Sequence, residues 1–159
     1  MFQFSKKDKG KIFSPQNGKA VLLHQVPDNA FSKKMIGDGI AIIPEDGKVY
    51  SPVNGIADDV PNTLHNYQIK SDDGLDILIQ VGIGTSELMG EGFKTYIKKG
   101  DKVKKGDLIA YADLNLFKEK GFPIHSPIII TNIENIKNVK FNVGNVKAFE
   151  TVIMEYRKL

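Results

Sequence analysis

The sequence predicts an all-β fold: an antiparallel β-sandwich or barrel-sandwich with internal duplication and one or two short helices, in a single domain over residues 1–159. Two observations favour this class. The 15 glycines and 7 prolines separate short stretches rich in Val, Ile, Phe and Tyr, a spacing typical of many short strands joined by turns. A strand-and-turn motif also occurs twice, and no linker or low-complexity segment divides the chain.

The predicted strands are short apolar or alternating stretches, each bounded by turn-forming residues. In chain order they cover residues 19–23, 39–43, 47–50, 66–70, 75–81, 108–111, 126–132 and 150–156.

Helical patterns are fewer than strand patterns. Phe93, Tyr96 and Ile97 have the i, i+3, i+4 spacing of a helix face and are followed by a glycine, so residues 90–100 predict a short helix. Residues 114–121, which read LNLFKEKG, predict another helix of one or two turns.

The repeated motif covers residues 10–18, GKIFSPQNG, and residues 47–55, GKVYSPVNG, with six of nine positions identical. Each copy is a short strand followed by Ser-Pro and then Asn-Gly, a strong turn signal. Two copies are too few for a solenoid. They predict two similar halves of a sandwich about a pseudo-twofold axis, and the alternative is two convergent hairpins.

A second pattern, G-D-x-V-x-x-G-D, runs from Gly100 to Asp107. It resembles the hairpin of biotinyl and lipoyl carrier domains, which need a lysine at an exposed tip in a Met-Lys-Met or Asp-Lys-Ala context. The chain has neither context. The pattern therefore predicts a structural turn, and a carrier domain is the weakest of the functions considered.

Composition and motifs argue against several other classes of function. The net charge is only +3 and the lysines are scattered, which disfavours a nucleic-acid platform. No cysteine is present, so disulfides and thiolate metal sites are excluded. His24, His65 and His125 lack the spacing of a zinc enzyme, and neither a G-x-S-x-G nor a phosphate-binding loop occurs. We expect no metal.

The chain shows no sign of export or of membrane insertion. Residues 1–11 lack the apolar region of a secretory signal, and the longest apolar runs are far too short to span a bilayer. We therefore expect a cytoplasmic, self-contained protein.

A predicted hairpin carries the residues of most interest. It turns at Asp72-Asp73-Gly74 and makes His65 and Gln80 near cross-strand partners. Alternation along the second strand separates a core face from an outer face. The core face takes Ile77, Ile79, Val81 and Ile83, and the outer face takes Asp76, Leu78, Gln80 and Gly82. We expect a shallow apolar dish that holds an amide and an imidazole.

The chain contains the string F-x-x-K-x-x-G-D-G-x-A-I from Phe31 to Ile42 and the string G-E-G-F from Gly90. Both strings are specific to the glucose-type IIA domain (EIIA type 1) of the bacterial phosphoenolpyruvate-dependent sugar phosphotransferase system (PTS), which nearly the whole chain resembles. Similar segments also cover residues 14–44, 51–57, 74–93, 98–109 and 126–132.

The resemblance implies a cytoplasmic β-sandwich with no cofactor that takes part in sugar uptake. In the family, a histidine accepts a phosphoryl group from the phosphohistidine of the phosphocarrier protein and passes it to a IIB domain. A second histidine, assisted by a threonine, hydrogen-bonds the phosphoryl oxygens. On the matching positions of this chain, the second histidine is His65 and the threonine is Thr63, but the acceptor position is occupied by Gln80.

Gln80 departs from the family signature, as do Gly84 and Ser86, and these last two favour natural divergence over an introduced change. An imidazole nitrogen is a competent nucleophile, whereas a carboxamide nitrogen has its lone pair delocalised into the carbonyl. We therefore expect that the protein cannot accept phosphate at position 80. It would act as a protein-binding or regulatory form that permanently presents an unphosphorylated face. The alternative is an active relay, with Gln80 an introduced change or with His65 or another residue as acceptor.

The resemblance also implies a docking surface for protein partners on a monomeric domain. Those partners are the phosphocarrier protein and a IIB domain, or regulated transporters and enzymes; the protein would dock on a membrane permease without inserting. We expect the surface to use Phe31, Met35, Ile36, Leu78 and Ser86, with Met89 at its rim. The alternative is that Phe31 and Ile36 belong to the core.

Overall fold

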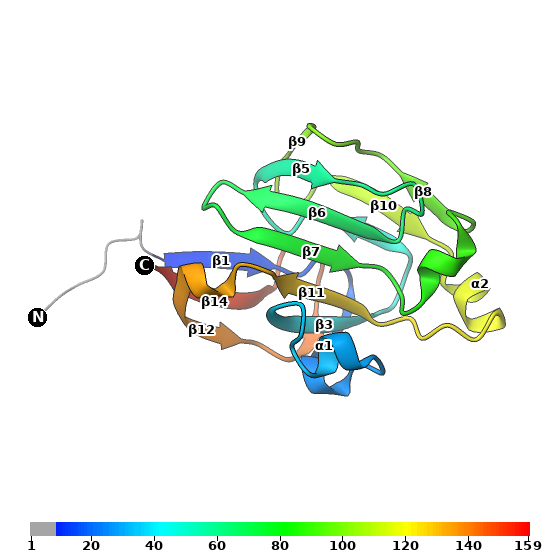
Figure 1. The fold of residues 1–159 in the computed structure, drawn as a ribbon, viewed down its shortest axis with the longest axis horizontal. Coiled ribbons are helices and arrows are strands. Elements are labelled where there is room, and N and C mark those ends of the chain that lie inside the picture. The colour runs from blue at the N-terminus through cyan, green and yellow to red at the C-terminus, as the bar shows by residue number, and fades with distance from the viewer. Residues whose placement is uncertain (1–8) are drawn as a thin grey trace, which may run out of the picture.

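Three antiparallel sheets form the molecule, and the predicted β-sandwich with two short helices is confirmed (Figure 1). The structure, a computed structural model, describes residues 9–159. The start of the predicted domain and most of the segment examined for a secretory signal, residues 1–8, lie outside the described residues.

The largest sheet has eight strands in the order β13-β2-β3-β11-β7-β6-β5-β9, and two three-stranded sheets have the orders β1-β14-β12 and β4-β10-β8. The strands are β1 (Lys9–Phe13), β2 (Gly18–Leu22), β3 (Asp38–Pro44), β4 (Lys48–Tyr50), β5 (Gly55–Asp59), β6 (Asn66–Ser71), β7 (Asp76–Gln80), β8 (Phe93–Thr95), β9 (Lys102–Val103), β10 (Leu108–Ala112), β11 (Ser126–Ile130), β12 (Ile136–Phe141), β13 (Gly144–Val146) and β14 (Val152–Lys158). The helices are α1 (Asn29–Ser32) and α2 (Leu114–Glu119), with short 3-10 turns η2 (Leu23–Gln25), η3 (Thr85–Leu88) and η4 (Ile133–Asn135).

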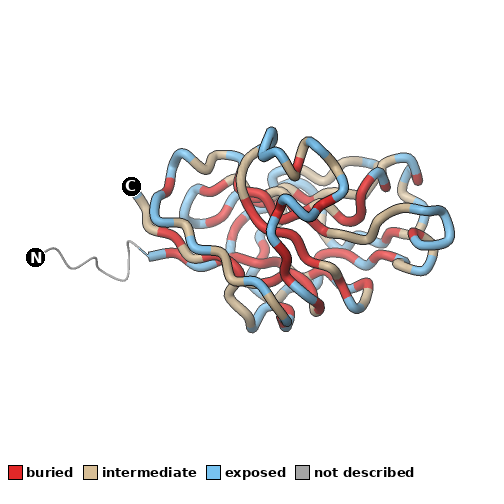
Figure 2. Tube along the Cα trace, turned by 90° about the horizontal axis from the view of Figure 1, so that it is seen from below, coloured by how far each residue is buried: buried red, intermediate tan, exposed pale blue. Residues whose placement is uncertain are grey.

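Two apolar clusters stabilise the fold. The larger lies between the inner faces of the sheets, where Figure 2 shows the buried parts of the chain gathered at the centre. The smaller lies on the opposite face of β2, β3 and β11, under η2 and α1. Its members are Val21, Leu23, Val26, Phe31, Ala41, Ile83 and Ile129.

The duplicated motif forms two copies that exchange equivalent hydrogen bonds. The Phe13 N–H donates to the Pro52 carbonyl at 3.1 Å, and the equivalent Tyr50 N–H donates to the Pro15 carbonyl at 2.8 Å. Within each copy the serine hydroxyl donates to the carbonyl two residues on, at 2.7 Å in both cases. The two copies therefore share the same hydrogen-bond pattern as well as similar residues.

The asparagines of the two copies have equivalent roles too. The Asn17 Oδ1 accepts from the Ala148 N–H at 2.8 Å, and the Asn54 Oδ1 accepts from the Lys105 N–H at 2.9 Å. Each copy therefore ties down a loop that lies far away in the sequence.

The G-D-x-V-x-x-G-D pattern closes two turns, as predicted. The carboxylate of Asp101 accepts from the Lys98 N–H at 2.9 Å, and that of Asp107 accepts from the Lys104 N–H at 2.8 Å. Both aspartates therefore stabilise the backbone here.

The eight predicted strands correspond to β2, β3, β4, β6, β7, β10, β11 and β14, and the helix predicted at residues 114–121 is α2. The helix predicted over residues 90–100 is wrong. Residues 93–95 form β8, which pairs with β10. Only Phe93 of the supposed apolar face is buried, against Phe117, whereas Tyr96 is exposed. Helix α1 was not predicted; Asp28 caps its first turn by accepting from the Ala30 N–H at 2.8 Å.

Candidate functional site

The hairpin of β6 and β7 places the site at its open end, next to β11. Its register pairs Asn66 with Gln80, so His65 and Gln80 are near cross-strand partners, as predicted, with an offset of one residue. His65 lies instead beside Val81, whose N–H donates to the His65 carbonyl at 2.7 Å. The amide and the imidazole still lie at neighbouring positions of adjacent strands.

The predicted faces of β7 are confirmed as far as Val81. Ile77, Ile79 and Val81 are buried in the larger cluster, while Leu78 and Gln80 are only partly buried on the other face.

Beyond Val81 the alternation fails. Gly82 has a φ of +80°, so the strand direction changes there. A side chain on Gly82 would meet Thr85 Cγ2 at 2.5 Å and the Phe117 ring, so this glycine faces the interior and not the dish. Ile83 is buried, but it packs in the smaller cluster. Glycine is required at position 82 because both the backbone angle and the available space exclude a Cβ.

Gln80 has a defined conformation at the end of β7. Its Nε2 donates a hydrogen bond to the Gly82 carbonyl at 3.1 Å. One amide N–H is therefore directed to the backbone of its own chain.

His65 is held on both sides of its ring. Thr63 Oγ1 lies 2.6 Å from Nδ1, and Asn66 Nδ2 lies 3.2 Å from Nε2. Burial lowers the pKa of the His65 imidazole, so the ring is neutral at pH 7. The structure thus brings together Thr63 and His65 as the sequence predicted, and it adds Asn66.

A third polar ring, His125, lies at the same end of the sheet. Its carbonyl accepts from the Gly82 N–H at 3.1 Å, which continues the pairing of β11 with β7. The Nδ1 of His125 is buried without a hydrogen-bond partner among the described residues, and burial lowers the pKa of the ring. Sequence reasoning missed this position because nothing in the chain indicates that β11 pairs with β7. His24, by contrast, is exposed in η2.

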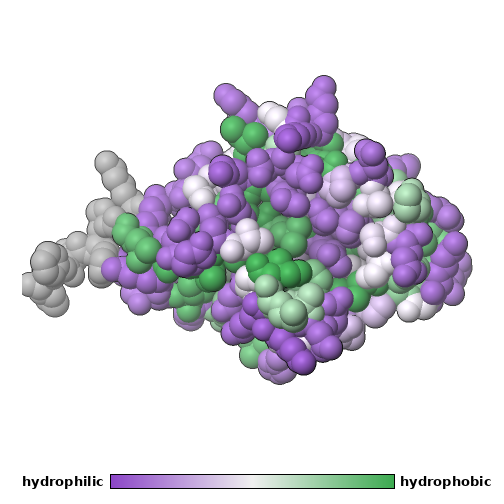
Figure 3. All heavy atoms as spheres, viewed as in Figure 1, coloured by the Kyte–Doolittle hydropathy of each residue, from purple (hydrophilic) through white to green (hydrophobic). Residues whose placement is uncertain are grey.

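The predicted docking residues divide into two groups. Phe31 is only 3% exposed and packs in the smaller cluster, so its assignment to the exposed surface is wrong. Phe31 lies in α1 and packs with residues of β2, β3 and β11. Met35 is 72% exposed and Ile36 is 38% exposed. Figure 3 shows apolar atoms ringed by hydrophilic residues over the segment that follows α1.

The other predicted contributors are closer to Gln80 in sequence. Leu78 is partly buried and packs against the smaller cluster. Ser86 is partly buried within η3, and Met89, just after η3, is 77% exposed. Phe31 therefore packs beneath the surface, and the other predicted residues form the part of it that is accessible.

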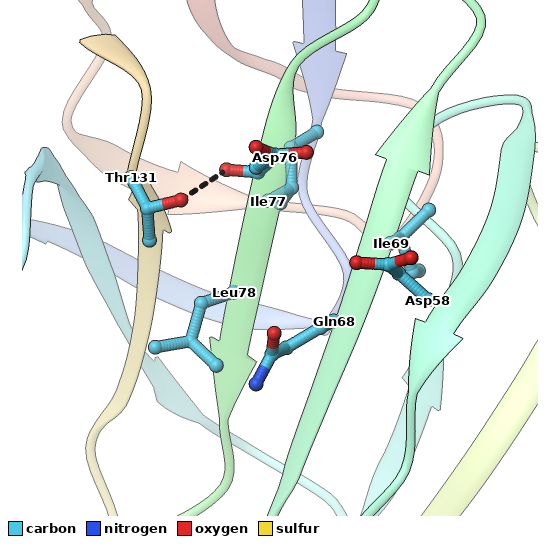
Figure 4. A pocket seen from close by; sticks show the side chains of 7 residues that line it. All are labelled: Asp58, Gln68, Ile69, Asp76, Ile77, Leu78 and Thr131. Carbon is cyan, nitrogen blue, oxygen red and sulfur yellow. Dashed lines mark hydrogen bonds between the residues drawn. The ribbon is translucent and has the colours of Figure 1, made fainter. Parts of the chain in front are cut away.

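A small hollow of about 110 Å³ adjoins Leu78 on the outer face of the hairpin (Figure 4). Asp58, Gln68 and Asp76 give it polar walls, and the Thr131 hydroxyl donates to the Asp76 carbonyl at 3.4 Å. Small-molecule sites usually measure several hundred Å³. The hollow is therefore too small for a sugar site.

Within residues 9–159, no three His, Cys, Asp or Glu side chains are grouped as metal ligands. Over the same range, none of the helices has the length and hydrophobicity needed to cross a bilayer.

The fold and site define a small β-sandwich in which His65 and Gln80 lie at the open end of the β6–β7 hairpin. Residues 10–136 match the family described as phosphoenolpyruvate-dependent sugar phosphotransferase system, EIIA 1. The chain belongs to this family. It is 43% identical over 151 residues to a PTS system glucose-specific EIIA component of Buchnera aphidicola subsp. Acyrthosiphon pisum, which covers 95% of this chain and 94% of the relative.

Two further similarities have different lengths of match. A PTS system glucose-specific EIICBA component of Staphylococcus saprophyticus is 37% identical over 142 residues, which are 89% of this chain but 21% of that longer protein. The solved structure of glucose permease IIA from Mycoplasma capricolum superimposes with a TM-score of 0.87 at 32% identity, covering 98% of this chain and 99% of that chain.

Proposed function

We propose that this chain is a glucose-type EIIA component that docks with phosphotransferase-system proteins but carries no phosphate at residue 80, and that it acts as a binding or regulatory form. The observation that supports this most directly is Gln80. It occupies the family's acceptor position on an intact β7, and its Nε2 donates to the Gly82 carbonyl at 3.1 Å.

Transfer from a phosphohistidine breaks the nitrogen–phosphorus bond of the donor and forms a new bond to a lone pair of the acceptor. The Gln80 nitrogen has no free lone pair, because it is conjugated with the carbonyl. A histidine at this position could donate through one ring nitrogen to the same Gly82 carbonyl and present the other nitrogen to a partner. The hydrogen-bonding role of residue 80 can therefore be retained while its reactivity is lost.

The docking face in this proposal consists of Met35, Ile36, Leu78, Ser86 and Met89. Exposed apolar side chains with a polar rim are typical of protein interaction sites. Gln80 is uncharged, so the face resembles that of an unphosphorylated family member. The partners would be the phosphocarrier protein and a IIB domain, or transporters and enzymes. The Staphylococcus relative, named as one EIICBA component, is consistent with EIIA acting beside other permease domains. We expect a monomer in the cytoplasm.

The test is incubation of the purified protein with phosphoenolpyruvate, the general PTS enzyme and the phosphocarrier protein, followed by intact-mass measurement. We expect no phosphoryl adduct, and an adduct in Gln80→His as the positive control. Omitting the phosphocarrier gives the background. A stoichiometric adduct on the unaltered protein would refute the proposed function.

A second candidate function, an active relay, has one observation in its favour. His125 lies beside Gly82, and its buried Nδ1 has no hydrogen-bond partner within residues 9–159, so a second imidazole is near the acceptor position. If the unaltered protein takes up phosphate, His125→Ala and His65→Ala identify the acceptor, since the adduct should disappear in one of them.

A further inference from the structure

We propose that Asn66 is a second block on phosphoryl transfer, because its side-chain amide occupies the His65 ring nitrogen that would otherwise serve an incoming phosphoryl group. This inference rests on the proposed function. It concerns a positioning residue, since Asn66 would act through His65.

The position of Asn66 follows from the register of the hairpin. It is the first residue of β6 and pairs directly with Gln80 of β7, so the two side chains share the outer face. From there the Asn66 Nδ2 reaches the His65 Nε2 at 3.2 Å, while Thr63 Oγ1 lies 2.6 Å from Nδ1. Both ring nitrogens of His65 therefore have hydrogen-bond partners within the chain.

These contacts fix where the ring proton lies. An amide NH₂ group only donates, so the Nε2 of His65 must accept, and the single proton of the neutral ring then lies on Nδ1 and is donated to Thr63. A phosphoryl oxygen requires a donor. In this tautomer Nε2 presents a lone pair that is already used by Asn66, so His65 cannot stabilise a phosphoryl group.

Reversing the Asn66 amide does not free the ring. The Oδ1 of Asn66 is buried and has no hydrogen-bond partner among residues 9–159. If the amide were turned so that Oδ1 faced His65, Nε2 would carry the proton and donate it to Asn66, again within the chain. In both orientations Asn66 occupies the same ring nitrogen.

It follows that restoring a histidine at position 80 removes only one of two obstacles. In Gln80→His the new nucleophile would stand beside a His65 that is still capped. In Gln80→His combined with Asn66→Ala, His65 could turn its Nε2–H toward the transferred group.

The experiment compares four proteins: the unaltered chain, Asn66→Ala, Gln80→His and the double variant. Each is mixed with the phosphorylated phosphocarrier, and adduct formation is followed by intact mass over time. Loss of one donor to a developing charge lowers a rate by about 10²–10³. We expect the double variant to react on the order of tenfold faster than Gln80→His, or more, and Asn66→Ala alone not to react.

A matched control is Gln68→Ala. Gln68 is the next outer-face residue of β6, opposite Leu78, and has no hydrogen bond to His65. Added to Gln80→His, it should leave the rate unchanged. Nitrogen-15 shifts of the His65 ring give a second readout that a purely structural role would not move: Asn66→Ala should shift the Nε2 resonance, and Gln68→Ala should not.

The inference is overturned if Gln80→His reacts as fast as the double variant, if the folded double variant stays unreactive, or if the His65 Nε2 resonance is the same with and without Asn66. None of these results contradicts the proposed function, which is refuted only if the unaltered chain is phosphorylated.

Discussion

The two faces of β7 obey different constraints. Ile77 and Ile79 on the inner face are at most 1% exposed and pack in the larger cluster. Leu78 and Gln80 on the outer face are partly exposed, and Gln80 contacts its own backbone. The inner positions require apolar side chains of a fitting shape, whereas the outer positions are defined by the polar groups and reactivity of their side chains. A chain can therefore lose reactivity at position 80 without losing its fold.

The comparison predicts its largest effect on the inner face. Ile79→Ala should lower the free energy of unfolding by about 4 kcal/mol, because it leaves a cavity in a fully buried cluster. Gln80→Ala, one residue along, should lower it by about 1 kcal/mol or less, since only one partly exposed hydrogen bond is lost. Urea unfolding of both variants measures the difference, and similar losses would show that the two faces are not distinct.

Phe31 and Met35 give the next test, since one is buried and the other exposed near the same helix. Phe31→Ala should lower the free energy of unfolding by about 3 kcal/mol. Met35→Ala should change it by about 0.5 kcal/mol or less and weaken binding of the phosphocarrier protein in a calorimetric titration. Unchanged binding in Met35→Ala would remove this side chain from the docking face.

The turn end of the β6–β7 hairpin should affect stability but not the reaction at the site end. The Tyr156 hydroxyl donates to Asp73 at 2.6 Å, and Lys158 forms an ion pair with the same carboxylate at 2.7 Å. Tyr156→Phe should lower the free energy of unfolding by about 1–2 kcal/mol and leave adduct formation in Gln80→His unaffected. Tyr96→Phe, at an exposed ring, is the control and should have no effect on stability. If Tyr156→Phe slowed adduct formation in Gln80→His, the turn end of the hairpin would be shown to affect the site end.

The final test is the dependence of stability on pH. Burial lowers the pKa values of His65 and His125 below the usual 6.5. As pH falls through 6.5 the unfolded chain takes up protons that the folded chain resists, so stability decreases, by at most about 1.4 kcal/mol per pH unit for each ring. Urea unfolding at pH 7.5 and 5.5 should show this decrease, and His125→Gln should reduce it. An unchanged slope in His125→Gln would mean that His125 titrates alike in both states.

The sequence predicted what depends on local pattern. Turn residues and apolar alternation identified eight strands, and the family motif directed attention to Thr63, His65 and Gln80. The prediction of a helix at residues 90–100 was wrong because the apolar spacing of Tyr96 and Ile97 arises by chance. Phe93 packs on Phe117 and begins strand β8. Strand β9, only two residues long, has too little pattern to be recognised.

Other features depend on contacts between segments far apart in sequence. The one-residue offset of His65 and Gln80, the inward direction of Gly82 and the position of His125 all follow from how β6, β7 and β11 are paired. The burial of Phe31 depends on how α1 folds against β3 and β11. Periodicity within one segment contains no information on such pairings.

The paired hydrogen bonds of the duplicated motif limit how this architecture can be divided. Phe13 donates to Pro52, and Tyr50 donates to Pro15, so each copy completes the backbone of the other. A chain cut between the copies would expose an unmatched donor and acceptor on both fragments. A fragment that carries one copy could satisfy them only by pairing with a second copy of the motif.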